Sequence, residues 1–274
     1  MRRGLIAALL TLALLAGLAF AGWKAYEYVY QRVTPEQCTV VMEGGTTVLS
    51  AEQARNASVI VAVSVERGLP ERAAVIALAT AYQESDLRNL DYGDRDSLGL
   101  FQQRPSYGWG TEEEIMDPWY SSARFYQELV KFSGWETGDI NDVAQQVQRS
   151  GFPEAYRQHV AKATAVAGAL RGSVPEGIAC LSFDDSPTPD PTAFEGVLAA
   201  LGDGVSVASE GDTSTVTAAD QTQLWSAAQL ALANSYAGGL TSVVVADREW
   251  TATEGRWRDA AQPAEAGTAV LTLG

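Results

Sequence analysis

The feature that most constrains this chain is an uncharged apolar run near its N-terminus. Arg2 and Arg3 precede the run, which extends from Leu5 to Trp23 and is 19 residues long. At about 1.5 Å per helical residue, such a run nearly spans the ~30 Å hydrocarbon core of a bilayer. Basic residues before the run favour an N-terminus that stays inside, so we expect the rest of the chain outside the cytoplasm.

Two fates of this run are compatible with export. Residues 19–21 (Ala-Phe-Ala) fit the small-residue site at which a secretory signal peptide is removed. The run is long, however, and Tyr26, Tyr28 and Tyr30 follow it at the depth where amphipathic rings settle. We therefore predict a transmembrane signal anchor over residues 1–25 and a stalk over 26–38, with the bulk of the chain extracellular; secretion after cleavage is the alternative.

The charged and metal-binding side chains exclude several classes of function. Lys and Arg total 19 against 34 Asp and Glu, which gives a net charge of −15 and argues against a nucleic-acid partner. Two cysteines and one histidine are too few for an ordinary zinc site, so we expect neither a metal nor a cofactor. A Ser-His-Asp triad would depend entirely on His159, which lies in an expected helix and is better explained as a surface or packing residue.

Cys38 and Cys180 are the only two cysteines, and outside the cytoplasm a disulfide is their default state. The bond would mark where one domain begins and ends. Two separate buried thiols, or a catalytic pair of one cysteine with His159, are the alternatives. Neither cysteine lies in a recognisable nucleophile setting, so we predict the disulfide.

Helical signals dominate the segment 39–182. Ser50 and Gln53 fit a capping box that opens a helix to about residue 67, and Pro70 suits the first position of a second helix to 85. Further helices are expected over about 117–132, 139–149 and 153–171. Residues 86–111 are rich in Gly, Asp and Ser and should form a long structured loop. We predict a mostly α domain.

The rest of the chain has a different character. Residues 183–192 carry prolines and aspartates and are typical of a stiff, solvated linker. Residues 193–274 are predicted to form a small α+β domain, with a helix over about 218–236 and strands over 242–246 and 269–273. Trp250 and Trp257 flank a Glu-Gly pair, as expected across a hairpin turn.

Glu84 is the first candidate catalytic residue. Helical spacing places it on the face of Ala77, Thr80 and Ala81, at the C-terminal end of the apolar helix 70–85. Poor solvation and the negative end of the helix dipole both disfavour the charged form. A carboxylic acid that keeps its proton near neutral pH is what a general acid in glycoside cleavage requires. A solvated residue at a helix end is the alternative.

The residues around Glu84 resemble a known family. The Glu84-Ser85 pair is followed by the segment SLGLFQ over 97–102, and this combination is similar to the lysozyme-like lytic transglycosylases. The longer stretch SLGLFQQRPSYGWGT, together with VQRSGFPEAY over 147–156, resembles a membrane-anchored subgroup from high-GC Gram-positive bacteria. The resemblance covers about residues 50–172. It implies a lysozyme-like fold and cleavage of the MurNAc-GlcNAc β-1,4 bond of peptidoglycan glycan strands.

The resemblance also implies roles for individual residues. Glu84 matches the general acid, then base, and the muramic acid 6-hydroxyl would attack the anomeric carbon to give a 1,6-anhydro product. The further positions carried over are substrate-binding candidates: Ser97, Gly99, Gln102, Tyr107, Trp109, Gln148 and Tyr156. Ser97 matches a cleft-lining hydroxyl, Gly99 would allow close approach of the sugar, and Gln102 matches a glutamine that binds near the acid and the sugar amide.

The aromatic residues and aspartates of this segment remain open to two interpretations. Tyr107 and Trp109, set among glycines, are the better candidates for sugar contact, whereas core packing equally explains Tyr82, Tyr92 and Phe101. The candidates for a second carboxylate lie in a loop rich in Gly and Asp, where a solvated turn is the alternative: Asp86, Asp91, Asp94 and Asp96.

One motif departs from the family. Many transglycosylases carry Ala-Tyr-Asn-Ala-Gly late in the domain, where this chain reads AQQVQRS over 144–150. Gln148 is a candidate replacement for the asparagine and Tyr156 for the tyrosine. The product is therefore either an anhydro sugar or that of simple hydrolysis.

Two functions other than catalysis are compatible with the sequence. The chain is alternatively a non-catalytic wall-binding or assembly protein of a secretion, conjugation or division complex, because a fold does not determine a function. In a third interpretation the C-terminal domain docks a protein partner through Trp225, Trp250 and Trp257, although the core of a small domain explains these residues better.

Overall fold

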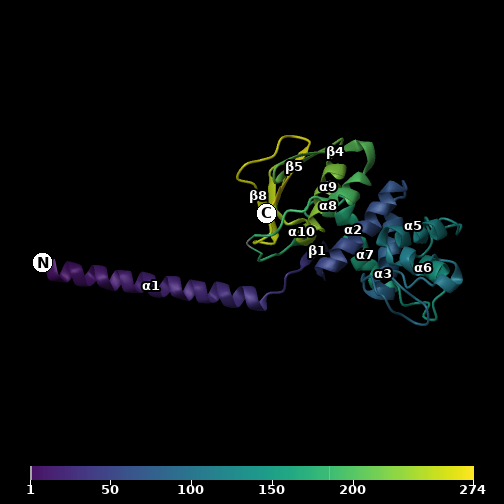
Figure 1. Cartoon of the computed structure of the whole chain (residues 1–274), viewed down its shortest axis with the longest axis horizontal. Coiled ribbons are helices and arrows are strands. Elements are labelled where there is room, and N and C mark those ends of the chain that lie inside the picture. The colour runs from purple at the N-terminus through teal and green to yellow at the C-terminus, as the bar shows by residue number, and fades with distance from the viewer. Residues whose placement is uncertain (1, 185) are drawn as a thin grey trace. The chain divides into compact units, whose positions relative to one another are not determined.

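The computed structural model describes residues 2–184 and 186–274, except for the side chains of residues 2–9. These residues form two units, one that ends at Glu36 and one that comprises Gln37–Gly274. The first unit consists of the long helix α1 (Arg2–Val33) and the three residues after it (Figure 1).

Helix α1 differs from the predicted anchor. It continues without a break through residues 26–33 of the predicted stalk, and Lys24 pairs with Glu27 at 2.7 Å across the predicted boundary. Within the part of the chain whose side chains are described, no helix is both long and apolar enough to cross a bilayer. The predicted transmembrane helix is therefore not supported. The described part of the apolar run covers only residues 10–23, which is shorter than a bilayer span, and residues 5–9 lie outside the described side chains.

The second unit combines helices with two antiparallel sheets. Its helices are α2 (Ala51–Glu66), α3 (Glu71–Ser85), α4 (Glu112–Met116), α5 (Pro118–Leu129), α6 (Ile140–Gln148), α7 (Val160–Leu170), α8 (Thr192–Ala199), α9 (Gln221–Leu232) and α10 (Ser235–Gly238). Short 3₁₀ turns lie at Pro105–Tyr107, Arg157–His159 and Gly202–Gly204. Its strands are β1 (Cys38–Met42), β2 (Gly45–Leu49), β3 (Ile178–Cys180), β4 (Val205–Glu210), β5 (Thr213–Ala218), β6 (Leu240–Val245), β7 (Arg248–Thr251), β8 (Arg256–Asp259) and β9 (Thr268–Leu273).

Within the second unit, we call residues 37–182 the helical half and residues 193–274 the C-terminal half. The helices of the helical half follow local sequence signals closely. The capping box of Ser50 and Gln53 opens α2 as predicted, and α3 begins directly after Pro70. Helix α3 is buried almost all round, in keeping with its apolar sequence. The predicted helix over 153–171 is too long: it begins only at Val160, and residues 153–159 form turns instead.

The strands form sheets with the orders β2-β1-β3 and β4-β5-β9-β6-β7-β8. The predicted hairpin is confirmed, since β7 and β8 pair with Trp250 opposite Trp257. The strands β6 and β9 are also present as predicted and lie side by side. The prediction missed the hairpins β1–β2 and β4–β5 and the helix α8.

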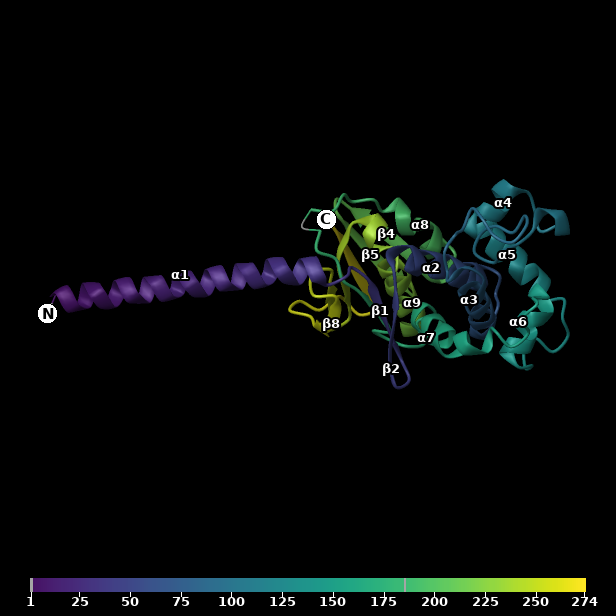
Figure 2. The ribbon, with the colours of Figure 1, turned by 90° about the horizontal axis from the view of Figure 1, so that it is seen from below.

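The predicted linker at 183–192 divides the sequence but not the hydrophobic core, which is one cluster formed from both sides of it. In α9, Gln229 donates to Ala169 O at 2.8 Å at the end of α7 and accepts from the Ile178 N–H of β3 at 3.1 Å. A buried amide is costly unless its hydrogen bonds are made, so these contacts tie the two halves together. Figure 2 shows α9 and α7 side by side.

The tryptophans of the C-terminal half belong to this core. Trp250 is fully buried and donates to Cys180 O at 2.9 Å, while Trp257 donates to Ile178 O at 2.8 Å. Trp225 is also buried and meets Trp257 edge to face. The favoured core interpretation therefore holds for Trp225 and Trp250, and Trp257 is partly buried against the same core, which leaves little of the three rings for the alternative docking surface.

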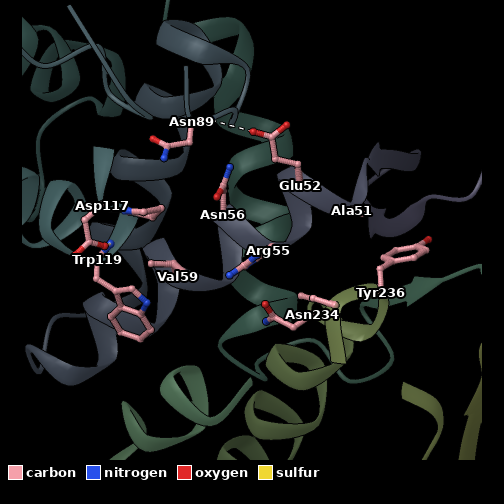
Figure 3. A pocket seen from close by; sticks show the side chains of 13 residues that line it. Ala51, Glu52, Arg55, Asn56, Val59, Asn89, Asp117, Trp119, Asn234 and Tyr236 are labelled. Carbon is pink, nitrogen blue, oxygen red and sulfur yellow. Dashed lines mark hydrogen bonds between the residues drawn. The ribbon is translucent and has the colours of Figure 1, made fainter. Parts of the chain in front are cut away.

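A cavity of about 550 Å³ lies where the two halves meet. Its walls come from the first turns of α2, the start of α5 and the segment from the end of α9 into α10 (Figure 3). Asn234 crosses this junction, because its side-chain amide donates to Ser58 Oγ on α2 at 2.9 Å.

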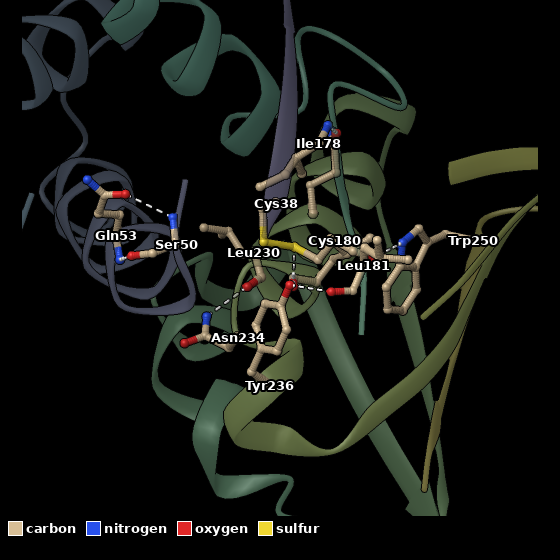
Figure 4. Close-up of a disulfide and its surroundings, with 12 residues drawn as sticks. Cys38, Ser50, Gln53, Ile178, Cys180, Leu181, Leu230, Asn234, Tyr236 and Trp250 are labelled. Atoms are coloured by element: carbon tan, nitrogen blue, oxygen red, sulfur yellow. Dashed lines mark hydrogen bonds between the residues drawn. A yellow bond between two sulfur atoms is a disulfide. The ribbon is translucent and has the colours of Figure 1, made fainter. Parts of the chain in front are cut away.

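The predicted disulfide between Cys38 and Cys180 is confirmed. The two residues are direct partners in the antiparallel pair β1–β3, so the bond reinforces an existing ladder (Figure 4). Their sequence separation of 142 residues encloses all of α2 to α7. Tyr236 and Trp250 surround it from the C-terminal half, donating to the carbonyl groups of Leu181 and Cys180.

Candidate active site

Glu84 lies in the last turn of α3 and is half-buried. Its Oε1 atom accepts a hydrogen bond of 2.7 Å from the hydroxyl of Tyr156, which is fully buried. The helix ends at Ser85, because the following residue, Asp86, adopts the left-handed conformation. The structure thus brings together two predicted site residues that lie 72 positions apart in the chain.

The surroundings of Glu84 raise its pKa above the ordinary glutamate value. Burial is the larger cause, since it penalises the charged form, and the hydrogen bond from Tyr156 opposes it by stabilising the carboxylate. Burial and the neighbouring Glu84 both raise the pKa of Tyr156 as well, so its hydroxyl stays neutral and remains a donor. The result is a carboxyl group that holds its proton to higher pH and has one oxygen fixed in place.

The segment 97–104 is fastened to the helix that carries Glu84. The Ser85 hydroxyl donates to Leu100 O at 2.7 Å, and the Gln148 side chain donates to Phe101 O at 2.8 Å from α6. The Phe101 ring stacks on Phe125 of α5, with centroids 4.7 Å apart. Three helices therefore hold this segment, and Gln148 acts here through a backbone carbonyl.

Gly99 has a structural reason to be glycine. Its φ is +75°, and a Cβ atom at this position would lie 2.7 Å from the carbonyl oxygen of Ile115. A side chain would therefore collide with the backbone at the end of α4. The requirement comes from this packing, whereas the predicted approach of a sugar stays a prediction.

Gln102 and Ser97 face their own loop. The Gln102 side-chain amide donates to the carbonyl groups of Tyr92 and Gly99, both at 3.3 Å. Ser97 is 7% exposed, so its hydroxyl has little access to solvent. Both residues shape the loop beside the site, and their predicted contacts with substrate remain predictions.

Exposure divides the candidate aromatic residues. Tyr107 is 69% exposed, with the Arg104 guanidinium 4.3 Å from the centre of its ring. Tyr92 is also exposed. Trp109 is half-buried against the core, and Tyr82 and Phe101 are buried within it. Tyr107 is therefore exposed as predicted, whereas Trp109 is only partly exposed.

Asp96, one of the candidates for a second carboxylate, braces the loop. It accepts from Arg104 Nε at 2.6 Å and from the Ser106 N–H at 2.9 Å. The hydrogen bonds from Ser106 and Arg104 hold its pKa well below the usual aspartate value. Asp86 accepts from Gln53 Nε2 at 3.0 Å, and Asp94 is almost fully exposed.

Sequence reasoning missed Gln83 as part of the site's framework. Its Oε1 atom lies 3.0 Å from His159 Nε2 and accepts from Gln158 Nε2 at 3.2 Å. These contacts hold the segment after Tyr156 against α3. His159 also stacks on Tyr82, which agrees with its predicted packing role. The only available signal for Gln83 was its place beside Glu84.

The described residues contain no cluster of His, Cys, Asp and Glu side chains suited to hold a metal ion. The geometry at the site places one half-buried carboxylic acid beside a fixed phenol, an arrangement suited to proton transfer. No protein-family model matches the chain, and a comparison with curated proteins finds none that is significantly similar in sequence.

Proposed function

We propose that the protein is a glycosidase that cleaves the MurNAc-GlcNAc β-1,4 bond of peptidoglycan, with Glu84 as general acid and then base. The observation that carries this proposal is the half-buried carboxyl group with a raised pKa, held by Tyr156 at the end of a buried helix. A group that keeps its proton near neutral pH is what a leaving alcohol needs. The likeness of the segment 84–102 to lytic transglycosylases supports the same substrate.

The hydrogen bond from Tyr156 suggests how one carboxyl group serves both steps. Tyr156 occupies Oε1, which leaves Oε2 to carry the acidic proton. Glu84 gives this proton to the glycosidic oxygen as the bond to the anomeric carbon breaks. The muramic acid 6-hydroxyl then bonds to that carbon and returns its proton to Glu84, so the enzyme is regenerated and an anhydro sugar is released. Water in place of the 6-hydroxyl gives hydrolysis instead.

The phenol also fits the change of charge during the reaction. Once the proton has left, Glu84 is an anion in poorly solvated surroundings, and a donor held at 2.7 Å stabilises it. The Cys38–Cys180 disulfide supports a place outside the cytoplasm for this activity, because such bonds persist in oxidising compartments. Peptidoglycan lies in such a compartment.

The test compares the wild type with Glu84→Gln, which keeps the shape of the side chain and removes the acid. Soluble muropeptides released from purified cell walls should fall by about 100-fold or more, as is typical for loss of a general acid. Glu71→Gln, the same change at the opposite end of α3, is the matched control and should keep its rate.

Release at the wild-type rate by Glu84→Gln would overturn the proposal, as would a wild type that releases nothing from any wall. Mass spectrometry of the wild-type products decides the reaction type. Anhydro ends indicate intramolecular attack by the 6-hydroxyl, whereas reducing ends indicate water.

A further inference from the structure

The cavity at the junction of the two halves has a rigid polar frame. Asn56 is buried and donates to Leu87 O at 2.8 Å, and the buried Asn234 donates to both Ser58 Oγ and Leu230 O at 2.9 Å. Tyr236 is held by its hydrogen bond of 2.7 Å to Leu181 O. These three side chains are therefore fixed before any ligand enters.

The charges in this cavity are separated. Glu52 accepts a hydrogen bond of 3.1 Å from the Asn89 N–H through Oε1, and Figure 3 shows the two residues facing each other. Arg55 extends into a different part of the cavity. Its guanidinium has no carboxylate within salt-bridge distance among the residues that the structure describes. The lining thus offers the unpaired guanidinium group of Arg55 on one side and the carboxylate of Glu52 on another.

We propose that this cavity binds the free ends of a short peptide, with Arg55 paired to the carboxylate and Glu52 to the ammonium group. Arginine matches a carboxylate with two parallel hydrogen bonds, and Glu52 keeps Oε2 for the ligand while Oε1 holds Asn89. Asn56 and Asn89 also line the cavity, and their side-chain amides are held by hydrogen bonds to Leu87 O and Met116 O. A volume of about 550 Å³ lies within the usual range for small-ligand sites.

Other ligand classes fit less well. A small anion would meet two carboxylates, Glu52 and Asp117, against the single cation Arg55. A sugar would need an exposed aromatic face, but the Trp119 ring packs on α8, where a Cβ on Gly196 would lie 3.1 Å from it. Asp117 already caps α5 by accepting from the Trp119 N–H at 2.9 Å, so a ligand with one charge of each sign matches the remaining pair, Arg55 and Glu52.

The experiment is calorimetric titration of the full chain with trialanine and with its N-acetylated, C-amidated form. Trialanine should bind saturably, and the capped peptide should bind at least about tenfold more weakly because both charged ends are lost. A further titration with free stem peptides from a purified wall distinguishes the source. Tighter binding of stem peptides assigns the site to the wall, and tighter binding of trialanine assigns it to ordinary peptides.

Two pairs of variants locate the site. Arg55→Gln should weaken binding about tenfold, whereas Arg67→Gln, an exposed arginine at the end of the same helix, should leave it unchanged. Glu52→Gln keeps the acceptor for Asn89 and should weaken binding, and Glu66→Gln is its control.

Equal binding of capped and free peptide would overturn the inference, as would equal losses in Arg55→Gln and Arg67→Gln, or no saturable binding. The inference does not depend on catalysis by Glu84. Glu84→Gln should bind trialanine as the wild type does, so a failure of the proposed enzyme activity and a failure of this site are separate results.

Discussion

Glu84 and Asp96 carry the same functional group in opposite surroundings. Glu84 is held at the end of α3 by one neutral donor, and burial raises its pKa. Asp96, in the loop that follows, has a guanidinium and a backbone N–H as donors, and these lower its pKa. The difference teaches that hydrogen-bond donors and solvation make one carboxyl group suited to the proposed proton transfer and the other to stabilising the loop, although the two lie only 12 positions apart in the sequence.

The largest difference between the two carboxyl groups should appear when Glu84 loses its hydrogen-bond donor. Tyr156→Phe deletes the hydrogen bond that lowers the pKa of Glu84, so this pKa should rise further. The alkaline limb of the pH-rate profile for muropeptide release, which reports loss of the acidic proton, should move to higher pH. The rate should fall by about tenfold because the carboxylate formed after proton transfer loses its donor.

Tyr126→Phe is the control for this prediction. Tyr126 is also buried, and its hydroxyl donates to Ile60 O at 2.9 Å and not to Glu84. Its removal should affect stability and leave the pH profile in place. If the alkaline limb does not move in Tyr156→Phe, or moves equally in both variants, Tyr156 is not the donor that lowers the pKa of Glu84.

Removing the Asp96 carboxylate should lower the stability of the fold and leave the rate of muropeptide release nearly unchanged. Asp96→Asn loses the ion pair with Arg104 and weakens the contact with Ser106, so the melting temperature should fall by a few degrees. Muropeptide release should stay within about threefold of the wild type, because no proton transfer is assigned to this carboxylate. Asp94→Asn, at a carboxylate that is 92% exposed, is the control and should change neither. A large loss of activity in Asp96→Asn alone would make Asp96 a second catalytic group.

The smallest expected effect is the dependence of stability on pH. The folded protein holds the Glu84 proton more tightly than the unfolded chain, so this residue makes stability fall as pH rises from the usual glutamate range through the raised pKa. The lowered pKa of Asp96 acts oppositely: its contribution is present above the usual aspartate range and is lost as pH falls. Thermal melts across pH should therefore show a gain of about one or two degrees at neutral pH for Glu84→Gln. The same loss at every pH would refute the raised pKa.

Local signals were enough to predict much of the helical half. The capping box at Ser50 and the proline at 70 each place a helix start within a residue or so, because caps act within one turn. Residues 153–159 were misassigned to a helix, since the turns that hold Tyr156 on Glu84 depend on partners more than 70 residues away. Helical periodicity has no access to such contacts.

The C-terminal half was harder to predict for a related reason. The first four residues of strand β5 alternate between partly exposed and buried, and its β-branched Thr and Val residues suit a strand, but the run is short and the strand was not predicted. The shared core depends on Gln229, a polar residue whose hydrogen bonds to Ala169 and Ile178 appear only once α7 and β3 are in place. For the site, Glu84 was a candidate from helical spacing and from the family resemblance, and Tyr156 from the resemblance alone, whereas the contacts of Asp96 with Arg104 and Ser106 followed from no signal in the sequence.

The disulfide has a mechanical consequence. Cys38 follows the first unit within two residues, and Cys180 immediately precedes the segment that leads to the C-terminal half. A pull between the two ends of the chain would therefore pass through the sulfur atoms and bypass the 141 residues between them, counted from the separation of 142. The part that carries Glu84 and Tyr156 would stay under no tension, and reducing the bond would place it directly in the path of the load.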